Sequence, residues 1–163
     1  MSLPRFLLSD ALRERVLREA RVAFPREGCG LIEGLRDGAE LHATAIHPVA
    51  NLADEPDRFE LDPAKHIALL RELRGTGRQI LGCYHSHPKG RAEPSARDRA
   101  GAFEDGFLWL IAAVDGEGRS ELNAYCAARG NFEVLEIAYT MEIPFPQRGR
   151  GIAYGDFWLA GFV

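Results

Sequence analysis

The hydrophobic and polar positions at the start of the chain predict a helix followed by two strands. One face of the helix is marked by apolar residues at helical spacing, namely Leu12, Val16, Ala20 and Phe24. Ser9 or Asp10 can cap the start of this helix, and Pro25 ends it. The apolar runs 28–35 and 40–51 that follow predict two strands.

A second helix is predicted directly after an acidic loop over residues 52–62. Asp62 and Pro63 form a favourable N-cap and first turn, and the helix continues to about Arg74. The residues expected to face inward from it are Ile67, Leu70 and Leu73. A third helix is predicted to begin at Ser95.

The remaining apolar runs predict further strands, over 78–87, 107–114, 120–127 and 132–139. The run 107–114 is apolar throughout, as expected for a central strand covered on both faces. Side chains of a strand alternate between its faces, so one face of the run 78–87 is expected to carry Leu81, Cys83, His85 and His87. The apolar phase shifts between Val134 and Leu135, which indicates a bulge in the last strand.

This order of elements (helix, strands, helix, strand, helix, strands) predicts an α/β fold with a mixed sheet flanked by helices. A length of 163 residues suits one domain with a substantial core. We divide the chain into a domain over 1–142 and an extension over 143–163 that is rich in aromatic residues and glycine. The apolar area of the extension predicts that it packs on its own domain or forms a homodimer contact.

Charge and cysteine content narrow the class of partner and the compartment. The net charge of −4, without a basic block, disfavours nucleic acid as the main partner. The three cysteines are odd in number and not closely paired, so a reducing cytoplasm is expected rather than a secreted disulfide framework. The N-terminus does not resemble a signal peptide, and no apolar run reaches the roughly 18 residues of a membrane span.

The stretch YHSHPKGRAEPSARD, residues 84–98, carries the chemistry. His85 and His87 point the same way from a strand end, and Asp98 can add an oxygen from the first turn of the next helix. Three protein ligands leave one tetrahedral position for water, which is typical of a catalytic zinc. The pattern also has a purely structural interpretation, because Ser95 and Asp98 match a capping-box variant. The two interpretations are compatible.

These residues resemble the JAMM (MPN-plus) signature of the Mov34-like metalloproteases. That signature has His-x-His-Pro, ten residues after the second histidine, and then an aspartate preceded by a serine at position −3. Upstream, PREGCGLIEG and NLADEPDRFELDP resemble two further family segments in the family's order, and the resemblance covers roughly residues 3–139. It implies a curved, partly barrel-like sheet similar to that of cytidine deaminases.

The resemblance also implies roles for individual side chains. His85, His87 and Asp98 would bind Zn²⁺, and Glu27 would hold the nucleophilic water, take its proton and return it to the leaving amine. Ser95 would donate a hydrogen bond to the developing oxyanion. Without the resemblance, Glu27 would be interpreted as a surface glutamate that follows a proline.

Other polar residues near these motifs are interpreted more simply. His42, His47 and His66 are expected to be surface or packing residues. Cys29 and Cys83 are expected to be small core residues beside the site, and Asn51 to orient a loop near it.

The family resemblance implies a substrate class. It indicates a zinc metallopeptidase that hydrolyses an amide or isopeptide bond after the Gly-Gly tail of a ubiquitin-like β-grasp protein, such as a sulfur carrier. A non-catalytic MPN scaffold is the alternative from another class. A relative of the RadC-type proteins linked to DNA repair is a third, although those typically read His-Asn-His-Pro where this chain has Ser86. The H-x-E and P-C-x-x-C motifs of zinc nucleobase deaminases do not occur.

Overall fold

The computed structural model describes residues 5–141 of the chain. The three helices are α1 (Asp10–Ala23), α2 (Pro63–Leu73) and α3 (Ala96–Gly101). The seven strands are β1 (Arg5–Ser9), β2 (Cys29–Asp37), β3 (Glu40–Val49), β4 (Gln79–His87), β5 (Leu108–Val114), β6 (Ser120–Ala128) and β7 (Asn131–Thr140). Every helix and strand that the hydrophobic pattern predicts between residues 5 and 141 is present, and β1 is an addition.

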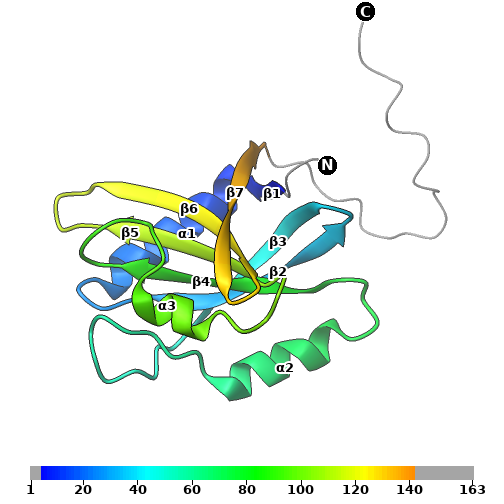
Figure 1. The fold of residues 1–163 in the computed structure, drawn as a ribbon, viewed down its shortest axis with the longest axis horizontal. Helices are drawn as coiled ribbons and strands as arrows, with labels where there is room; N and C mark the ends of the chain where they lie inside the picture. The colour runs from blue at the N-terminus through cyan, green and yellow to red at the C-terminus, as the bar shows by residue number, and fades with distance from the viewer. Residues whose placement is uncertain (1–4, 142–163) are drawn as a thin grey trace, which may run out of the picture.

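The strands form a closed barrel in the order β1-β3-β2-β4-β5-β6-β7 (Figure 1). Most neighbours are antiparallel, but β4 pairs with β5 in parallel, and β1 pairs in parallel with both β3 and β7. The sheet is therefore mixed, as predicted. The β4–β5 pair places the ends of both strands at the same edge, and β4 ends there at His87.

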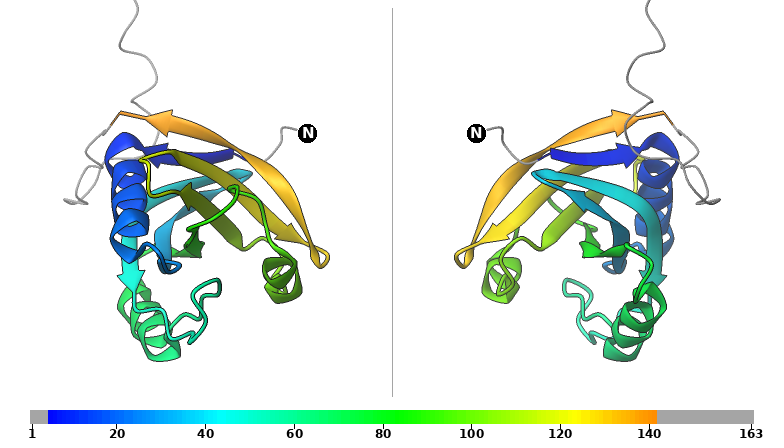
Figure 2. Two further views of the ribbon diagram at one scale, coloured as in Figure 1. Left: turned by 90° about the vertical axis from the view of Figure 1, so that its left-hand side faces the viewer. Right: turned by 90° about the vertical axis from the view of Figure 1, so that its right-hand side faces the viewer.

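Apolar side chains fill the two faces of the sheet separately. On one face α1 packs through Val16, Leu17 and Ala20. On the other face lie α2, α3 and the loop between β3 and α2, and Figure 2 shows that loop between the two helices. Strand β5 is fully buried, with Leu110 in the α1 core and Trp109 in the opposite one. The prediction of a central strand covered on both faces is confirmed.

The predictions for two strands need correction. The pairing of β7 with β6 runs without a shift through Val134 and Leu135, so no bulge lies there. The register shifts instead where β2 meets its neighbours, and the β2–β4 pairing skips Leu81. Because Leu81 is the extra residue, its side chain points into the core under α1, whereas Cys83 packs in the core on the opposite face. Leu81 therefore does not share a face with the two histidines.

The predicted inward face of α2 is correct at Leu73 but wrong at Ile67 and Leu70. Leu69 and Leu73 are buried under the helix, while Ile67 and Leu70 are about half exposed. Phe24, predicted on the apolar face of α1, instead follows the last helical residue and is 38% exposed. Both errors lie at the boundary of an apolar stripe, where helical spacing alone discriminates poorly between neighbouring positions.

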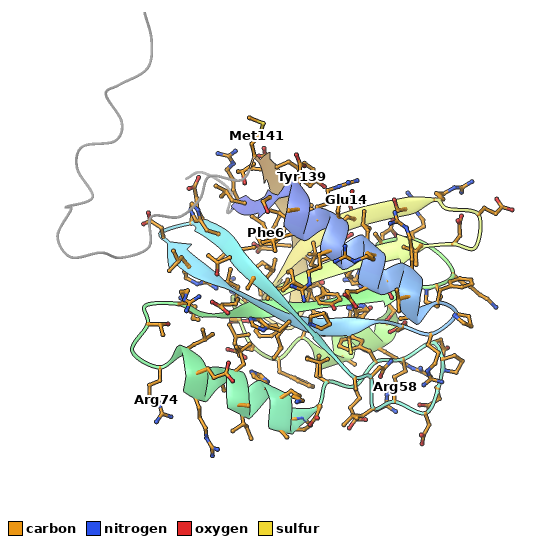
Figure 3. All side chains as sticks on the ribbon, turned by 180° about the vertical axis from the view of Figure 1, so that it is seen from behind. Phe6, Glu14, Arg58, Arg74, Tyr139 and Met141 are labelled. Carbon is orange, nitrogen blue, oxygen red and sulfur yellow. The ribbon has the colours of Figure 1, made fainter. Side chains whose placement is uncertain are left out.

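The described chain ends far from the loop between β3 and α2. Figure 3 shows Tyr139 and Met141 at one end of the molecule and Arg58 at the other. The predicted extension 143–163 lies outside the described residues, so its packing and its role in a homodimer stay predictions. Within residues 5–141, none of the helices has both the length and the apolar character to cross a membrane.

Candidate metal centre

Three side chains converge at the edge where β4 ends. His85 and His87 lie at the C-terminal end of β4, and Asp98 is the third residue of α3. All three residues are buried, and their ligand atoms lie within 4.8 Å of one another. The structure thus brings together the residues that the sequence predicts as a metal site.

The distances between these atoms fit a small divalent cation. His85 Nε2 lies 3.0 Å from His87 Nε2 and 3.2 Å from Asp98 Oδ1, and His87 Nε2 lies 3.5 Å from Asp98 Oδ2. Two ligand atoms of a tetrahedral zinc with bonds of about 2.0–2.1 Å are separated by about 3.3 Å. Acceptor atoms that converge this closely need a cation or a shared proton among them. Two imidazoles and a carboxylate are a common ligand set for catalytic zinc.

The orientation of His87 is set by a hydrogen bond. Its Nδ1 lies 2.9 Å from the carbonyl oxygen of Arg91. Because a carbonyl only accepts, Nδ1 carries the proton and donates it, so Nε2 presents its lone pair to the site. This arrangement is the usual support for a metal-binding histidine.

Asp98 is oriented by the start of its own helix. Ser95 is the N-cap of α3: its Oγ accepts from the amide of Asp98 at 3.1 Å, and Asp98 Oδ2 accepts from the amide of Ser95 at 2.6 Å. The capping box that the sequence predicts is therefore present, and it aims the carboxylate at the two imidazoles. The structural interpretation of Ser-x-x-Asp is confirmed, and it is compatible with the metal-binding one.

Burial and hydrogen bonding act in opposite directions on the charges here. Burial raises the pKa of Asp98, but hydrogen bonds from His85, His87 and Ser95 outweigh it and leave the pKa well below its usual range. Burial lowers the pKa of His85. For His87 burial also acts downward, but its bonds to Asp98 and Arg91 outweigh it and raise its pKa. An ionised Asp98 and a neutral His85 are the forms that bind a cation.

Glu27 lies beside this cluster in the segment that enters β2. It is 7% exposed, so the interpretation as a surface residue is wrong. Burial is the main cause that raises the pKa of Glu27 to about 7; Asp98 and Asp57 act in the same direction, and His87 and Arg97 oppose the shift. A carboxyl group with a pKa near neutrality can take up and release a proton at physiological pH.

The residue between the two histidines holds the Glu27 segment against β4. The Ser86 hydroxyl accepts from the amide of Gly28 at 2.8 Å, and the amide of Ser86 donates to the carbonyl of Gly28 at 2.9 Å. Ser86 is fully buried. The sequence offered no signal for this pairing, because it depends on the register between β2 and β4.

The chain matches a family model over residues 9–125, described as prokaryotic homologues of the JAB domain. It belongs to the JAB-domain family. The match covers most of the described chain, from the N-cap of α1 through Tyr125 in β6.

Relatives of this JAB-domain protein have names that describe peptidases. A desampylase of Haloferax volcanii is 37% identical over 121 residues, which are 71% of this chain and 86% of that protein. A probable TtuB-protein conjugate cleaving protease of Thermus thermophilus is 38% identical over 96 residues, 58% of each chain. The predicted JAMM family and enzyme class, a JAMM-type peptidase, are confirmed.

Solved structures have the same architecture as this JAB domain. A protein of Desulfitobacterium hafniense superposes with a TM-score of 0.77 at 30% identity, over 85% of this chain and 95% of that one. A JAB1/MPN domain protein of Archaeoglobus fulgidus reaches a TM-score of 0.53 at 19% identity, over 85% and 100% of the two chains. The predicted fold class, a mixed and curved barrel-like sheet with flanking helices, is confirmed.

Asp98 of the candidate metal site lines a cleft of about 440 Å³ in this JAB domain. Glu27, Ser95 and Asp98 line one part of it, and Phe59 and Trp109 another. Asp57 and Arg97 also line it and form an ion pair of 3.5 Å between exposed side chains of the two rims.

Cys83 lies in β4, the strand of the two histidines, and Cys29 pairs with His85 from β2; both cysteines are buried, as predicted. Burial raises the pKa of Cys29 to about 12, and it raises the pKa of Cys83 as well. Both thiols are therefore protonated near neutral pH, and neither is activated as a nucleophile.

Proposed function

We propose that the protein is a zinc-dependent isopeptidase that cuts after the C-terminal Gly-Gly tail of a ubiquitin-like β-grasp modifier. The observation that carries this proposal is the convergence of His85, His87 and Asp98 at one buried point, with Glu27 beside them at the same cleft. The relatives named as desampylases and as a TtuB-protein conjugate cleaving protease support the substrate class.

The residues divide the chemical work between them. His85, His87 and Asp98 would hold Zn²⁺, which when bound polarises a carbonyl oxygen and lowers the pKa of water to about 7. Glu27 accepts a proton from the attacking water and delivers it to the leaving amine. Its pKa of about 7 suits both directions of transfer.

Ser95 is assigned to the developing oxyanion. It lies at the N-cap of α3 and lines the same cleft as Glu27. Its Oγ accepts a hydrogen bond from the backbone amide of Asp98. The hydroxyl hydrogen is therefore free to be donated into the cleft. Where such a donor was removed in other enzymes, about 3–4 kcal/mol of transition-state stabilisation was lost.

The charges of the cleft suit an isopeptide substrate better than a free amino acid as leaving group. Its two guanidinium groups, on Arg58 and Arg97, each have an acidic partner in Glu55 and Asp57. Neither is available without competition to bind a free carboxylate. The leaving group is therefore proposed to be the amine of a lysine in a conjugated protein.

The free thiols of the described chain agree with the expected cytoplasmic location.

The proposal is tested with a β-grasp modifier joined through its terminal Gly-Gly to the lysine of a reporter protein. Purified protein loaded with Zn²⁺ is expected to release the reporter, and chelation is expected to stop the release. The variant Glu27→Gln is expected to retain about one zinc per chain and to lose at least about 100-fold in kcat. A wild-type protein that binds no zinc, or binds it and cleaves no Gly-Gly conjugate, would contradict the proposal.

A further inference from the structure

The two histidines of the cluster are held in place by different means. The ring of His87 is oriented through its Nδ1, which donates to the carbonyl of Arg91. The Nδ1 atom of His85 is buried and has no hydrogen-bond partner among the described residues. Apart from the contacts of its Nε2 within the cluster, the His85 ring therefore has no hydrogen bond that sets its plane.

Aromatic rings supply this support. The ring of Phe59 is stacked on His85, with centroids 4.3 Å apart and planes inclined by 17°. Trp109 meets His85 edge-on at 5.9 Å and Phe59 at 6.0 Å, so the three rings form one contact group. Rotation of the His85 ring away from the site would break this stacking. From this contact we infer that Phe59 is a positioning residue for a metal ligand.

Phe59 belongs to a loop that is also held by Arg26, whose guanidinium donates to the carbonyls of Ala53 and Asp54, and by the Asp57–Arg97 ion pair. Residues 54–60 are exposed apart from Phe59, which is half-buried. The base of the loop is closed by a bridge between Asn51 and Leu61 and by the bond from the amide of Leu52 to the carbonyl of Glu60 at 2.9 Å. Within this segment, Phe59 is the residue whose ring is stacked on His85.

Asn51 fixes the backbone on both sides of Phe59. Its Nδ2 donates to the carbonyl of Arg58 at 2.8 Å, and its Oδ1 accepts from the amide of Glu60 at 3.0 Å. The same Nδ2 donates to the carbonyl of Glu27 at 2.9 Å. Asn51 therefore joins the segment that carries Phe59 to the segment that carries Glu27. The expectation that Asn51 orients a nearby loop is confirmed, and the loop is part of the site.

We propose that Asn51 and Phe59 act as a pair that sets the affinity of the centre for its metal through the orientation of His85. This inference rests on the proposed metal site but concerns residues outside the ligand set. It assigns the loop between β3 and α2 a second role: besides forming a wall of the substrate cleft, it completes the metal centre.

The experiment measures zinc affinity by competition with a chromophoric chelator, independently of activity. Removal of a group that orients a ligand typically costs 10- to 100-fold in metal affinity, so Phe59→Ala is expected to lose at least about tenfold and Phe59→Tyr, which keeps the ring, less than about threefold. Leu52→Ala is the matched control. Leu52 lies in the same loop and is 49% exposed, but it has no ring that could stack on His85 as Phe59 does. Its affinity is expected to equal that of the wild type.

Two further readouts separate positioning from general stability. The visible absorption of bound Co²⁺ reports ligand geometry, and it is expected to change in Phe59→Ala and not in Leu52→Ala. Asn51→Ala is also expected to weaken zinc binding, and the double variant with Phe59→Ala to be no weaker than the weaker single variant, because the two residues act in series.

The outcomes are distinguishable. A wild-type protein without zinc affinity overturns the proposed function. Wild type and Phe59→Ala with equal affinity and equal Co²⁺ spectra overturn only the positioning role. Should Phe59→Ala fail to fold, Phe59→Leu keeps apolar volume without a flat ring, and wild-type affinity in that variant overturns the role equally.

Discussion

The hydroxyl group of Ser95 serves α3 and the cleft with different atoms. Its oxygen caps the helix by accepting from the amide of Asp98, and in the proposed mechanism its hydrogen is donated to a substrate oxygen. Since Asp98 is aimed by the same capping box, a change at Ser95 acts on stability and on catalysis together. These two effects can be separated with a second helix cap in the same protein.

Ser95→Ala is expected to lower kcat by about 100- to 1000-fold, as loss of an oxyanion donor does elsewhere. It is also expected to lower the free energy of unfolding by about 1 kcal/mol through loss of the N-cap. Asp62→Ala removes the N-cap of α2, where Oδ1 accepts from the amide of Ala64 at 2.9 Å, and should lower stability similarly without lowering kcat. Equal kcat losses in the two variants would assign Ser95 a structural role alone.

Burial of the ionised Glu27 carboxylate lowers the free energy of unfolding of the metal-free protein. Its pKa is raised by burial from 4.5 to about 7, so the folded chain holds this proton more tightly than the unfolded chain does. Below pH 4.5 both states are protonated and the penalty is absent. The penalty grows as pH rises from 4.5 to 7 and is constant above.

Glu27→Gln is therefore expected to make the metal-free protein more stable than the wild type at pH 8, by about 1–3 kcal/mol. The gain should shrink as pH falls from 7 to 4.5. Urea unfolding of both metal-free proteins at pH 5 and pH 8 measures the difference. A gain of equal size at both pH values would mean that ionisation of Glu27 is not its cause.

Spacing along the chain was sufficient to predict that His85, His87 and Asp98 converge, because these residues lie within one strand end and the following helix start, and the family resemblance added Ser95. It was not sufficient for Phe59 or Ser86. Phe59 is an aromatic residue in a loop of charged residues, and its contact with His85 depends on how that loop folds back. Ser86 gains its role from the register between two strands.

At the scale of elements, the missing strand was β1. It is five residues long, and its parallel partners β3 and β7 are distant in the sequence, so no local hairpin signal marks it. The skipped residue Leu81 was missed for a related reason. A bulge is a shift in the pairing between two strands, so the alternation of side chains within β4 alone does not reveal it.

The pairing of β2 with both neighbours depends on a glycine at position 30. A Cβ atom there would lie 2.4 Å from the carbonyl oxygen of His47 and 2.4 Å from Cε1 of the buried Tyr84 ring. Neither group can withdraw easily, because one is backbone of β3 and the other is packed in the core under α1. Gly30 is therefore required by the close approach of β2 to its neighbours.

Gly30→Ala is expected to lower the free energy of unfolding by about 1–3 kcal/mol or more, measured from urea midpoints. Gly116→Ala is the control, since a Cβ there would meet the Phe24 ring at an ordinary 3.7 Å. That variant is expected to stay within about 0.5 kcal/mol of the wild type. Equal midpoints for all three proteins would contradict the close-approach argument.

At the scale of the whole molecule, the candidate metal site and the end of the described chain lie apart. The last described residue, Met141, is at the opposite end from Arg58, which lines the cleft. We therefore expect deletion of the residues beyond Ile143 to change solubility or self-association more than zinc content. Light scattering after size-exclusion chromatography and elemental analysis measure the two properties. Loss of zinc in the truncated protein would contradict this expectation.

The barrel is closed by the pairing of β1 with β7, from Arg5 opposite Glu136 to Ser9 opposite Thr140. During synthesis on the ribosome, the first strand leaves the exit tunnel long before the strand that must lie beside it. Until β7 follows, β1 and β6 each present an unpaired edge that can pair with another chain. Chaperone engagement during translation should therefore persist until the seventh strand has emerged.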